Sequence, residues 1–133
     1  MKSLWDQVRD RAEGRCEYCR LPQSAVEFAF PVDHVRARQH RGETEAANLA
    51  LSCPRCNAHK GPNVAGYDPA TGALTRLFNP RRDRWGKHFT WSAATIVGRT
   101  AVGRTTVEVL AMNSPDAVAA REALMKEGWR PAD

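Results

Sequence analysis

Apolar residues near the start of the chain recur at the spacing of one helical face, with polar residues between them. This apolar set consists of Leu4, Trp5, Val8 and Ala12. Ser3 stands before the set as a candidate N-cap, and Asp6 follows three residues later in a variant of the capping box. Gly14 lies just beyond the set and can end a helix. The pattern therefore predicts an N-terminal helix between Ser3 and Gly14.

The apolar spacing then changes to the alternation typical of a strand over residues 25–35. Its alternating apolar positions are Val26, Phe28 and Phe30. Pro31 lacks a backbone N–H, so it argues against a central strand. We expect an edge strand here, or one that bends at the proline.

A polar stretch over residues 36–46 predicts a loop, and alternation returns over residues 48–52 as a second strand. A short helix is expected to include Ala58–Lys60, because Gly61 and the proline after it end it quickly. The predicted order is thus strand, loop, strand and helix.

The rest of the chain predicts further strands and two helices. Strands are expected over residues 74–78 and around residues 94–97. In residues 105–112 the β-branched side chains favour a strand, while the spacing of the apolar ones favours a helix; we expect a helix. A last helix is predicted between a Ser114 cap and Gly128. Helices and strands in this order predict an α+β fold, and the 133 residues suit one domain over residues 1–133.

Composition is that of an ordinary globular protein, with 42% hydrophobic and 26% charged residues. No stretch reaches the ~18 consecutive apolar residues that a membrane span requires. The N-terminal residues carry charges where a signal peptide would be apolar. We therefore expect a cytoplasmic protein with no membrane partner.

The cysteines form two C-x-x-C pairs that leave none over: Cys16, Cys19, Cys53 and Cys56. Disulfides would suit a secreted chain, but thiols stay reduced in the cytosol. A redox C-x-x-C is another alternative, although two such pairs on one chain favour a metal. Four thiolates suit tetrahedral zinc, so we predict a closed structural Zn²⁺ site.

Net charge is +5 and the pI is about 9.4, which favours a polyanionic partner. Basic residues gather in residues 36–41 and 81–88, the second group interleaved with Trp85 and Phe89. These aromatics could stack on bases, but core anchors are the favoured interpretation. We predict nucleic-acid contacts at Arg36, Arg38, Lys60, Arg81, Arg82 and Arg84. An exposed helix face without such a contact is the alternative for Lys60.

Three short motifs accompany the cysteines: DH at 33–34, NLALSC at 48–53 and CNAHK at 56–60. Together they resemble the HNH endonuclease family, many members of which carry such cysteine pairs. RAEGRCEYC at 11–19 and residues 66–91 also look like a small bacterial group of this family. The resemblance implies a ββα-metal core at about 14–65, stapled by the zinc site, with residues 66–133 as an extension packed on it.

The resemblance also implies the role of each site residue. His34 corresponds to the general base that activates water, and Asp33 to a carboxylate ligand of a catalytic divalent cation. Asn48 corresponds to the asparagine that orders the loop and holds the base in place. Asn57 corresponds to the second protein ligand, and His59 is the alternative.

Elementary chemistry agrees with these roles. Oxygen ligands suit Mg²⁺ or Mn²⁺, and a histidine can take a proton from water near neutral pH. Adjacent strand residues point to opposite faces, so either the chain bends to bring Asp33 and His34 together or one of them acts through its neighbour; we expect the bend.

The function predicted is hydrolysis of DNA phosphodiester bonds, leaving a 5′-phosphate and a 3′-hydroxyl as the family does, by a monomer or homodimer. No small-molecule cofactor is expected. A non-catalytic, zinc-stabilised DNA-binding module with the same fold is the alternative, and a small zinc-stabilised interaction protein is a third. The joint presence of Asp33, His34, Asn48 and Asn57 favours the enzyme.

Overall fold

The N-terminal helix forms as its apolar spacing predicts. In a computed structural model, which describes residues 1–131, α1 spans Leu4–Arg11. The Ser3 hydroxyl accepts a hydrogen bond from the Asp6 N–H at 3.1 Å. Val8 is fully buried, whereas Trp5 is 43% exposed, so its expected place on the buried face is wrong. Trp5 lies about 100° around the helix from its neighbour Leu4, outside the stripe that packs on the core.

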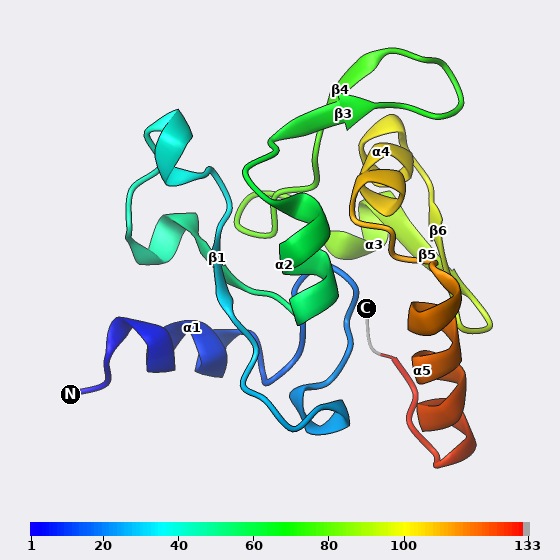
Figure 1. The fold of residues 1–133 in the computed structure, drawn as a ribbon, viewed down its shortest axis with the longest axis horizontal. Helices are drawn as coiled ribbons and strands as arrows, with labels where there is room; N and C mark the ends of the chain where they lie inside the picture. The colour runs from blue at the N-terminus through cyan, green and yellow to red at the C-terminus, as the bar shows by residue number, and fades with distance from the viewer. Residues whose placement is uncertain (132–133) are drawn as a thin grey trace.

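A β-hairpin and a helix form the centre of the N-terminal half (Figure 1). β1 (Val32–His34) pairs antiparallel with β2 (Leu49–Leu51), with Asp33 opposite Ala50. Helix α2 (Pro54–Lys60) follows directly, and Cys53 caps it by accepting a hydrogen bond from the Cys56 N–H. The strand–strand–helix order is confirmed. α2 begins four residues before the expected Ala58–Lys60 segment.

Of the strand predicted over residues 25–35, the part after Pro31 forms as β1, whereas the part before Pro31 does not form, because Gln23 takes its hydrogen bonds. A short 3₁₀ turn, η1 (Gln23–Ala25), stands at its start. The Gln23 amide oxygen accepts from the Phe30 N–H at 2.6 Å, and its nitrogen donates to the Phe28 carbonyl at 2.7 Å. These bonds replace a partner strand. Phe30 is buried while Phe28 is 78% exposed, so these two alternating residues do not share a buried face.

The loop between β1 and β2 contains two further 3₁₀ turns, η2 (Arg38–His40) and η3 (Ala46–Asn48). Arg11 of α1 donates to the backbone carbonyls of Ala46 and Leu49, at 2.9 and 2.6 Å. The first helix therefore braces the end of this loop and the start of β2.

Two hairpins and three helices make up the remainder. β3 (Ala65–Tyr67) pairs with β4 (Leu74–Arg76), and β5 (Phe89–Ser92) pairs with β6 (Thr95–Gly98). The helices are α3 (Trp85–His88), α4 (Ala101–Val109) and α5 (Pro115–Lys126). The strands expected at 74–78 and 94–97, the helix within 105–112 and the last helix are confirmed; β3, β5 and α3 were not predicted.

The two halves meet around α2 and the turn before α3 (Figure 1). The Trp85 indole N–H donates to the Tyr18 carbonyl at 2.8 Å, and Arg81 forms an ion pair with Glu17. Both bonds connect the C-terminal half to the first cysteine pair. Within residues 1–131, no helix has the length and apolar character to cross a membrane.

Candidate metal sites and basic surface

The four cysteines converge between the two cysteine-bearing turns. All four side chains are buried, and their sulfurs lie within 4.8 Å of one another. Cys16 accepts a hydrogen bond from the Cys19 N–H at 3.4 Å, and Cys53 accepts one from the Cys56 N–H at the same distance. The two turns are therefore built alike, each presenting a pair of sulfurs to one point.

The sulfur geometry fits tetrahedral zinc. With Zn–S bonds of about 2.3 Å, the sulfurs of such a site lie about 3.8 Å apart. The sulfurs of Cys19 and Cys53 are separated by 3.7 Å. Hydrogen bonds among the four thiols hold the pKa of Cys53 far below its usual value and raise the pKa of Cys19 and of Cys56 well above it. Among the described residues this is the one group of three or more Cys, His, Asp or Glu side chains that could hold an ion.

A buried arginine compensates the negative charge of this cluster. Arg121 of α5 is 1% exposed and lines a cavity of about 230 Å³ together with three of the cysteines. Its guanidinium donates to the Ala94 carbonyl at 2.7 Å and to the Asn113 amide oxygen at 3.0 Å. Burial lowers its pKa, and the charges of Cys19 and Cys56 oppose that effect. Nothing in the sequence pattern singled out Arg121.

Asp33 lies in β1 with its carboxylate turned into the protein. It is 6% exposed, accepts a hydrogen bond from the Tyr18 hydroxyl at 2.8 Å, and pairs with the Lys60 ammonium at 3.1 Å. Burial raises the pKa of Asp33, while the Lys60 charge and the Tyr18 hydrogen bond oppose the rise. Burial also raises the pKa of Tyr18 well above its usual value, so this phenol remains a donor.

His34, the next residue, is held by a different partner. Its Nε2 lies 2.8 Å from the Thr44 hydroxyl, across the loop between the two strands. The expected bend at Asp33–His34 is absent, since both residues keep regular register with β2. The two side chains therefore have separate partners, as alternation in a strand requires.

Asp33, His34 and Asn57 nevertheless border the same surface depression, of about 350 Å³. Asn57 lies on α2 and is half-buried. Arg38 also lines the depression, which places one basic side chain beside the candidate catalytic group. His59 is exposed and does not line it, in keeping with its position two residues farther along the helix.

Asn48 lies at the base of the loop and satisfies three backbone groups. Its amide oxygen accepts from the Arg36 N–H at 2.9 Å, and its nitrogen donates to the carbonyls of Arg36 and Glu43 at 3.0 and 2.8 Å. These bonds close the loop that carries Thr44, the partner of His34. None of these three hydrogen bonds joins Asn48 to His34 directly.

The basic residues predicted to touch nucleic acid separate into different environments. Lys60 is 1% exposed and paired with Asp33, so the expectation of a surface phosphate contact, and the alternative of an exposed helix face, are both wrong. Arg81 is occupied by its ion pair with Glu17, so it is a link within the protein. Arg36, Arg82 and Arg84 are exposed, as is Arg38.

The aromatic residues of the second basic group are core anchors. Trp85 is 3% exposed and Phe89 is 1% exposed, with ring centroids 5.0 Å apart. The alternative that they stack on bases is wrong, because neither ring face is accessible.

Sequence reasoning missed two groups that hold the candidate catalytic pair. Thr44 is a loop residue whose role depends on the closed conformation of that loop, so no local signal marks it. Tyr18 stands inside the first C-x-x-C turn, and its position between two metal-ligand candidates was a usable signal that it is buried near the site.

A ββα unit beside four converging cysteines, with a DH pair on its first strand, is the arrangement that the sequence motifs predicted. Residues 16–63 match the family model described as HNH endonuclease, which confirms the resemblance inferred from the motifs. Such a match indicates a nuclease or DNA-binding function.

A more extended similarity reaches beyond this segment. The chain is 26% identical over 109 residues to the Septu protein PtuB of Bacillus thuringiensis. That alignment covers 80% of this chain but 40% of the relative, so the chain spans less than half of that protein's length. No solved structure matches the chain.

Proposed function

We propose that the protein is a metal-dependent endonuclease that hydrolyses phosphodiester bonds in DNA. The observation that carries this proposal is the depression bordered jointly by Asp33, His34 and Asn57, from β1 and α2. A proton acceptor and two oxygen donors around one accessible surface can act together on a phosphodiester. The Arg38 side chain at the same depression supplies a positive charge for the substrate phosphate.

In this proposal His34 is the general base. When Nε2 donates its proton to Thr44, the lone pair lies on Nδ1, which then accepts the proton of the attacking water. Thr44 fixes the ring orientation, and Asn48 fixes the loop that carries Thr44. Asn48 is therefore a positioning residue.

Asp33 and Asn57 would hold the catalytic cation, which we infer to be Mg²⁺ or Mn²⁺. Their carboxylate and amide oxygens are the hard donors that such ions prefer. Both Asp33 oxygens already have partners, but a carboxylate has about four acceptor positions, and Oδ1 has one partner, Lys60, at 3.4 Å. The donor set therefore fits. When bound, the cation supplies charge neutralisation at the phosphate and the leaving oxygen.

The zinc inferred at the four cysteines has a structural role in this account, because all four sulfurs are consumed in a closed, buried group. Such a site needs all four cysteines to be reduced, as they are in the cytoplasm, which we infer as the compartment. A single small unit meets one strand at a time, so a double-strand cut would require a homodimer.

Plasmid nicking tests the proposal and its ligand assignment together. We expect the zinc-loaded protein to convert supercoiled plasmid into nicked circles only when Mg²⁺ or Mn²⁺ is added. Asn57→Ala should raise the metal concentration needed for half-maximal rate, since it removes one oxygen donor.

His59→Ala is the matched variant, because it alters an exposed side chain on the same helix that does not reach the depression. It should nick as the wild type does. Absence of metal-dependent nicking would refute the nuclease proposal, and a loss in His59→Ala alone would move the ligand assignment to that residue.

One observation favours the second candidate, a non-catalytic DNA-binding module. The Lys60 ammonium already neutralises Asp33 from within the protein, as an ion pair with both side chains buried. A protein of this second kind would bind plasmid DNA without nicking it under any of the metal conditions above.

A further inference from the structure

A cleft lies next to the candidate catalytic depression, between residues 16–63 and the C-terminal half. Its volume is about 600 Å³. Val35 and Arg36, which directly follow the DH pair, line one side together with Lys60 of α2. Residues 76–79 and 82–83 line the other side. A strand bound at His34 would therefore continue into this cleft.

The two basic groups of the sequence meet at this cleft. Arg36 and His40 come from the loop after β1, and Arg82 comes from the turn before α3. All three side chains are exposed. Arg76 also lines the cleft, but its charge is offset by an ion pair with Asp83 at 2.7 Å. Arg36 and Arg82 have no such ion pair within residues 1–131, so the rim carries a net positive charge.

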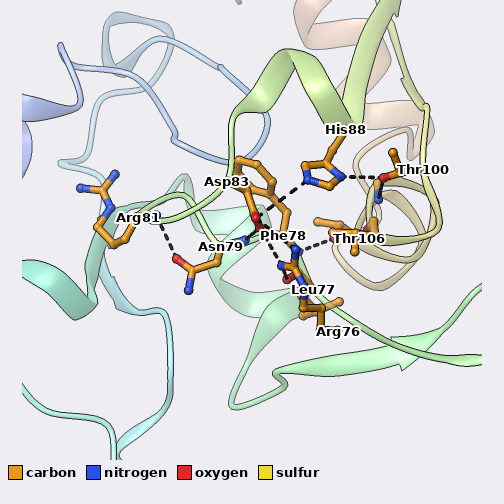
Figure 2. A network of polar contacts seen from close by, with 11 residues as sticks. Arg76, Leu77, Phe78, Asn79, Arg81, Asp83, His88, Thr100 and Thr106 are labelled. Atoms are coloured by element: carbon orange, nitrogen blue, oxygen red, sulfur yellow. Dashed lines mark hydrogen bonds and ion pairs between the residues drawn. The ribbon is translucent and has the colours of Figure 1, made fainter.

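A network of polar contacts fixes the turn that presents Arg82, as Figure 2 shows around Asp83. Asp83 accepts two hydrogen bonds from Arg76, at 2.7 and 3.0 Å, and a third from the Asn79 N–H at 2.8 Å. Asn79 in turn accepts from the Arg81 N–H at 2.9 Å. This wall is preorganised, which reduces the cost of ordering it around a ligand.

The interior of the cleft is less polar than its rim. Val64, which is 43% exposed, and Leu77 contribute apolar surface, while the amides of Asn63 and Asn79 add hydrogen-bonding groups. A volume of about 600 Å³ lies within the range of small-ligand sites and suits one nucleotide better than a stretch of double helix. Cations for a phosphate, apolar surface for a base and amides for its edge are the features of a nucleotide site.

We propose that this cleft binds one unpaired nucleotide next to the scissile phosphate, and that the substrate is single-stranded or locally opened nucleic acid. The proposal rests on the proposed function in taking nucleic acid as the ligand and His34 as the place of the scissile phosphate, whereas binding in the cleft requires no cleavage. It assigns the C-terminal half a direct part in substrate binding, through Arg82, and gives the convergence of the two basic groups a purpose.

Fluorescence anisotropy with a labelled oligonucleotide tests the proposal. The zinc-loaded protein is titrated without Mg²⁺ or Mn²⁺, using a single strand and the duplex of the same sequence. We expect the single strand to bind more tightly, and Arg82→Ala to weaken its binding about tenfold, as for loss of a charged hydrogen bond. Arg99→Ala is the matched control, because it removes the same charge from an exposed residue outside the cleft. It should change the affinity less than about twofold.

A second pair of variants tests the cleft interior without removing an arginine. Val64→Glu places a negative charge in the cleft, and Val97→Glu places it on β6 at a residue of similar exposure, 41%. Only the first should weaken binding. Equal effects within either pair, or a duplex that binds as tightly as the single strand, would overturn the proposal.

Cleavage and binding can fail separately. If plasmid is nicked but the Arg82 and Arg99 variants bind alike, the nuclease proposal stands and the cleft proposal fails. If no plasmid is nicked but Arg82→Ala, unlike Arg99→Ala, binds the single strand more weakly, the cleft proposal stands and the nuclease proposal fails.

Discussion

Asp33 and Lys60 form the most buried ion pair near the candidate catalytic group, and their environment decides what each can do. The Lys60 ammonium lies 3.1 Å from Asp33 Oδ2 and 3.1 Å from the His34 carbonyl. It therefore holds the side chain of Asp33 and the backbone of His34. A charge buried without its partner is costly, so each residue depends on the other for stability.

Lys60→Met should lower the free energy of unfolding by about 3 kcal/mol, because it leaves the Asp33 carboxylate buried with Tyr18 as its remaining partner. The double variant Lys60→Met/Asp33→Asn should recover most of that loss, since neither charge remains. Urea unfolding of zinc-loaded proteins measures both values. A double variant no more stable than Lys60→Met would contradict the ion-pair account.

For single residues, the sequence predicted which side chains form the candidate site better than it predicted what surrounds each of them. The identities of Asp33, His34 and Asn57 follow from motif spacing, and the structure brings them to one depression. That Lys60 turns inward could not be predicted, because it depends on a carboxylate 27 residues earlier in the chain. Thr44 was invisible for the same reason, since its contact with His34 crosses a loop.

Among the elements, β6 and α4 approach each other unusually closely. A Cβ added at Gly103 would lie 2.0 Å from the His88 carbonyl oxygen, and one at Gly98 would lie 2.4 Å from the Arg104 nitrogen. Both glycines are therefore required by packing, which lets α4 lie against the β5–β6 hairpin and the end of α3. His88 also bonds the Thr100 hydroxyl that caps α4, at 2.6 Å (Figure 2).

Gly103→Ala should destabilise the protein by about 2 kcal/mol, because the clash with backbone outweighs the better helix propensity of alanine. Gly86→Ala in α3 is the matched control, since its Cβ would meet no atom within 4 Å. It should be neutral or slightly stabilising. Thermal or urea unfolding distinguishes the two, and equal stabilities would contradict the close packing of α4.

Elements with strong local signals were predicted, and those that depend on distant partners were not. Helices α1 and α5 were predicted because their N-cap residues, Ser3 and Ser114, mark where each helix begins. The strand expected before Pro31 failed because Gln23 satisfies the backbone there. β5 was missed although Phe89 and Trp91 alternate with polar residues, because so short a run becomes a strand only through its pairing with β6.

Across the whole molecule, the four cysteines connect the first turn after α1 to the start of α2. The C-terminal half covers the same region through Trp85 and Arg121. Structural zinc contributes on the order of 10 kcal/mol to the folding of small domains. We therefore infer that the metal, more than the short strands, holds the N-terminal half together.

Cys53→Ser should lose nearly all bound zinc and much of the far-ultraviolet circular dichroism. It removes one of the four candidate zinc ligands, while the serine hydroxyl can still cap α2, so the effect reports the metal site. His59→Ala, at an exposed position on the same helix, is the control and should retain zinc and fold. A folded Cys53→Ser protein with full zinc content would contradict the four-cysteine site.

The central claim, that His34 activates water for phosphodiester hydrolysis, is tested most directly by chemical rescue in the plasmid assay with Mg²⁺ or Mn²⁺. His34→Ala should nick about 10²–10⁴-fold more slowly than the wild type while keeping its zinc and its fold. Added imidazole should restore part of the lost rate, because it supplies the missing proton acceptor. A His34→Ala protein that nicks at the wild-type rate would contradict the account.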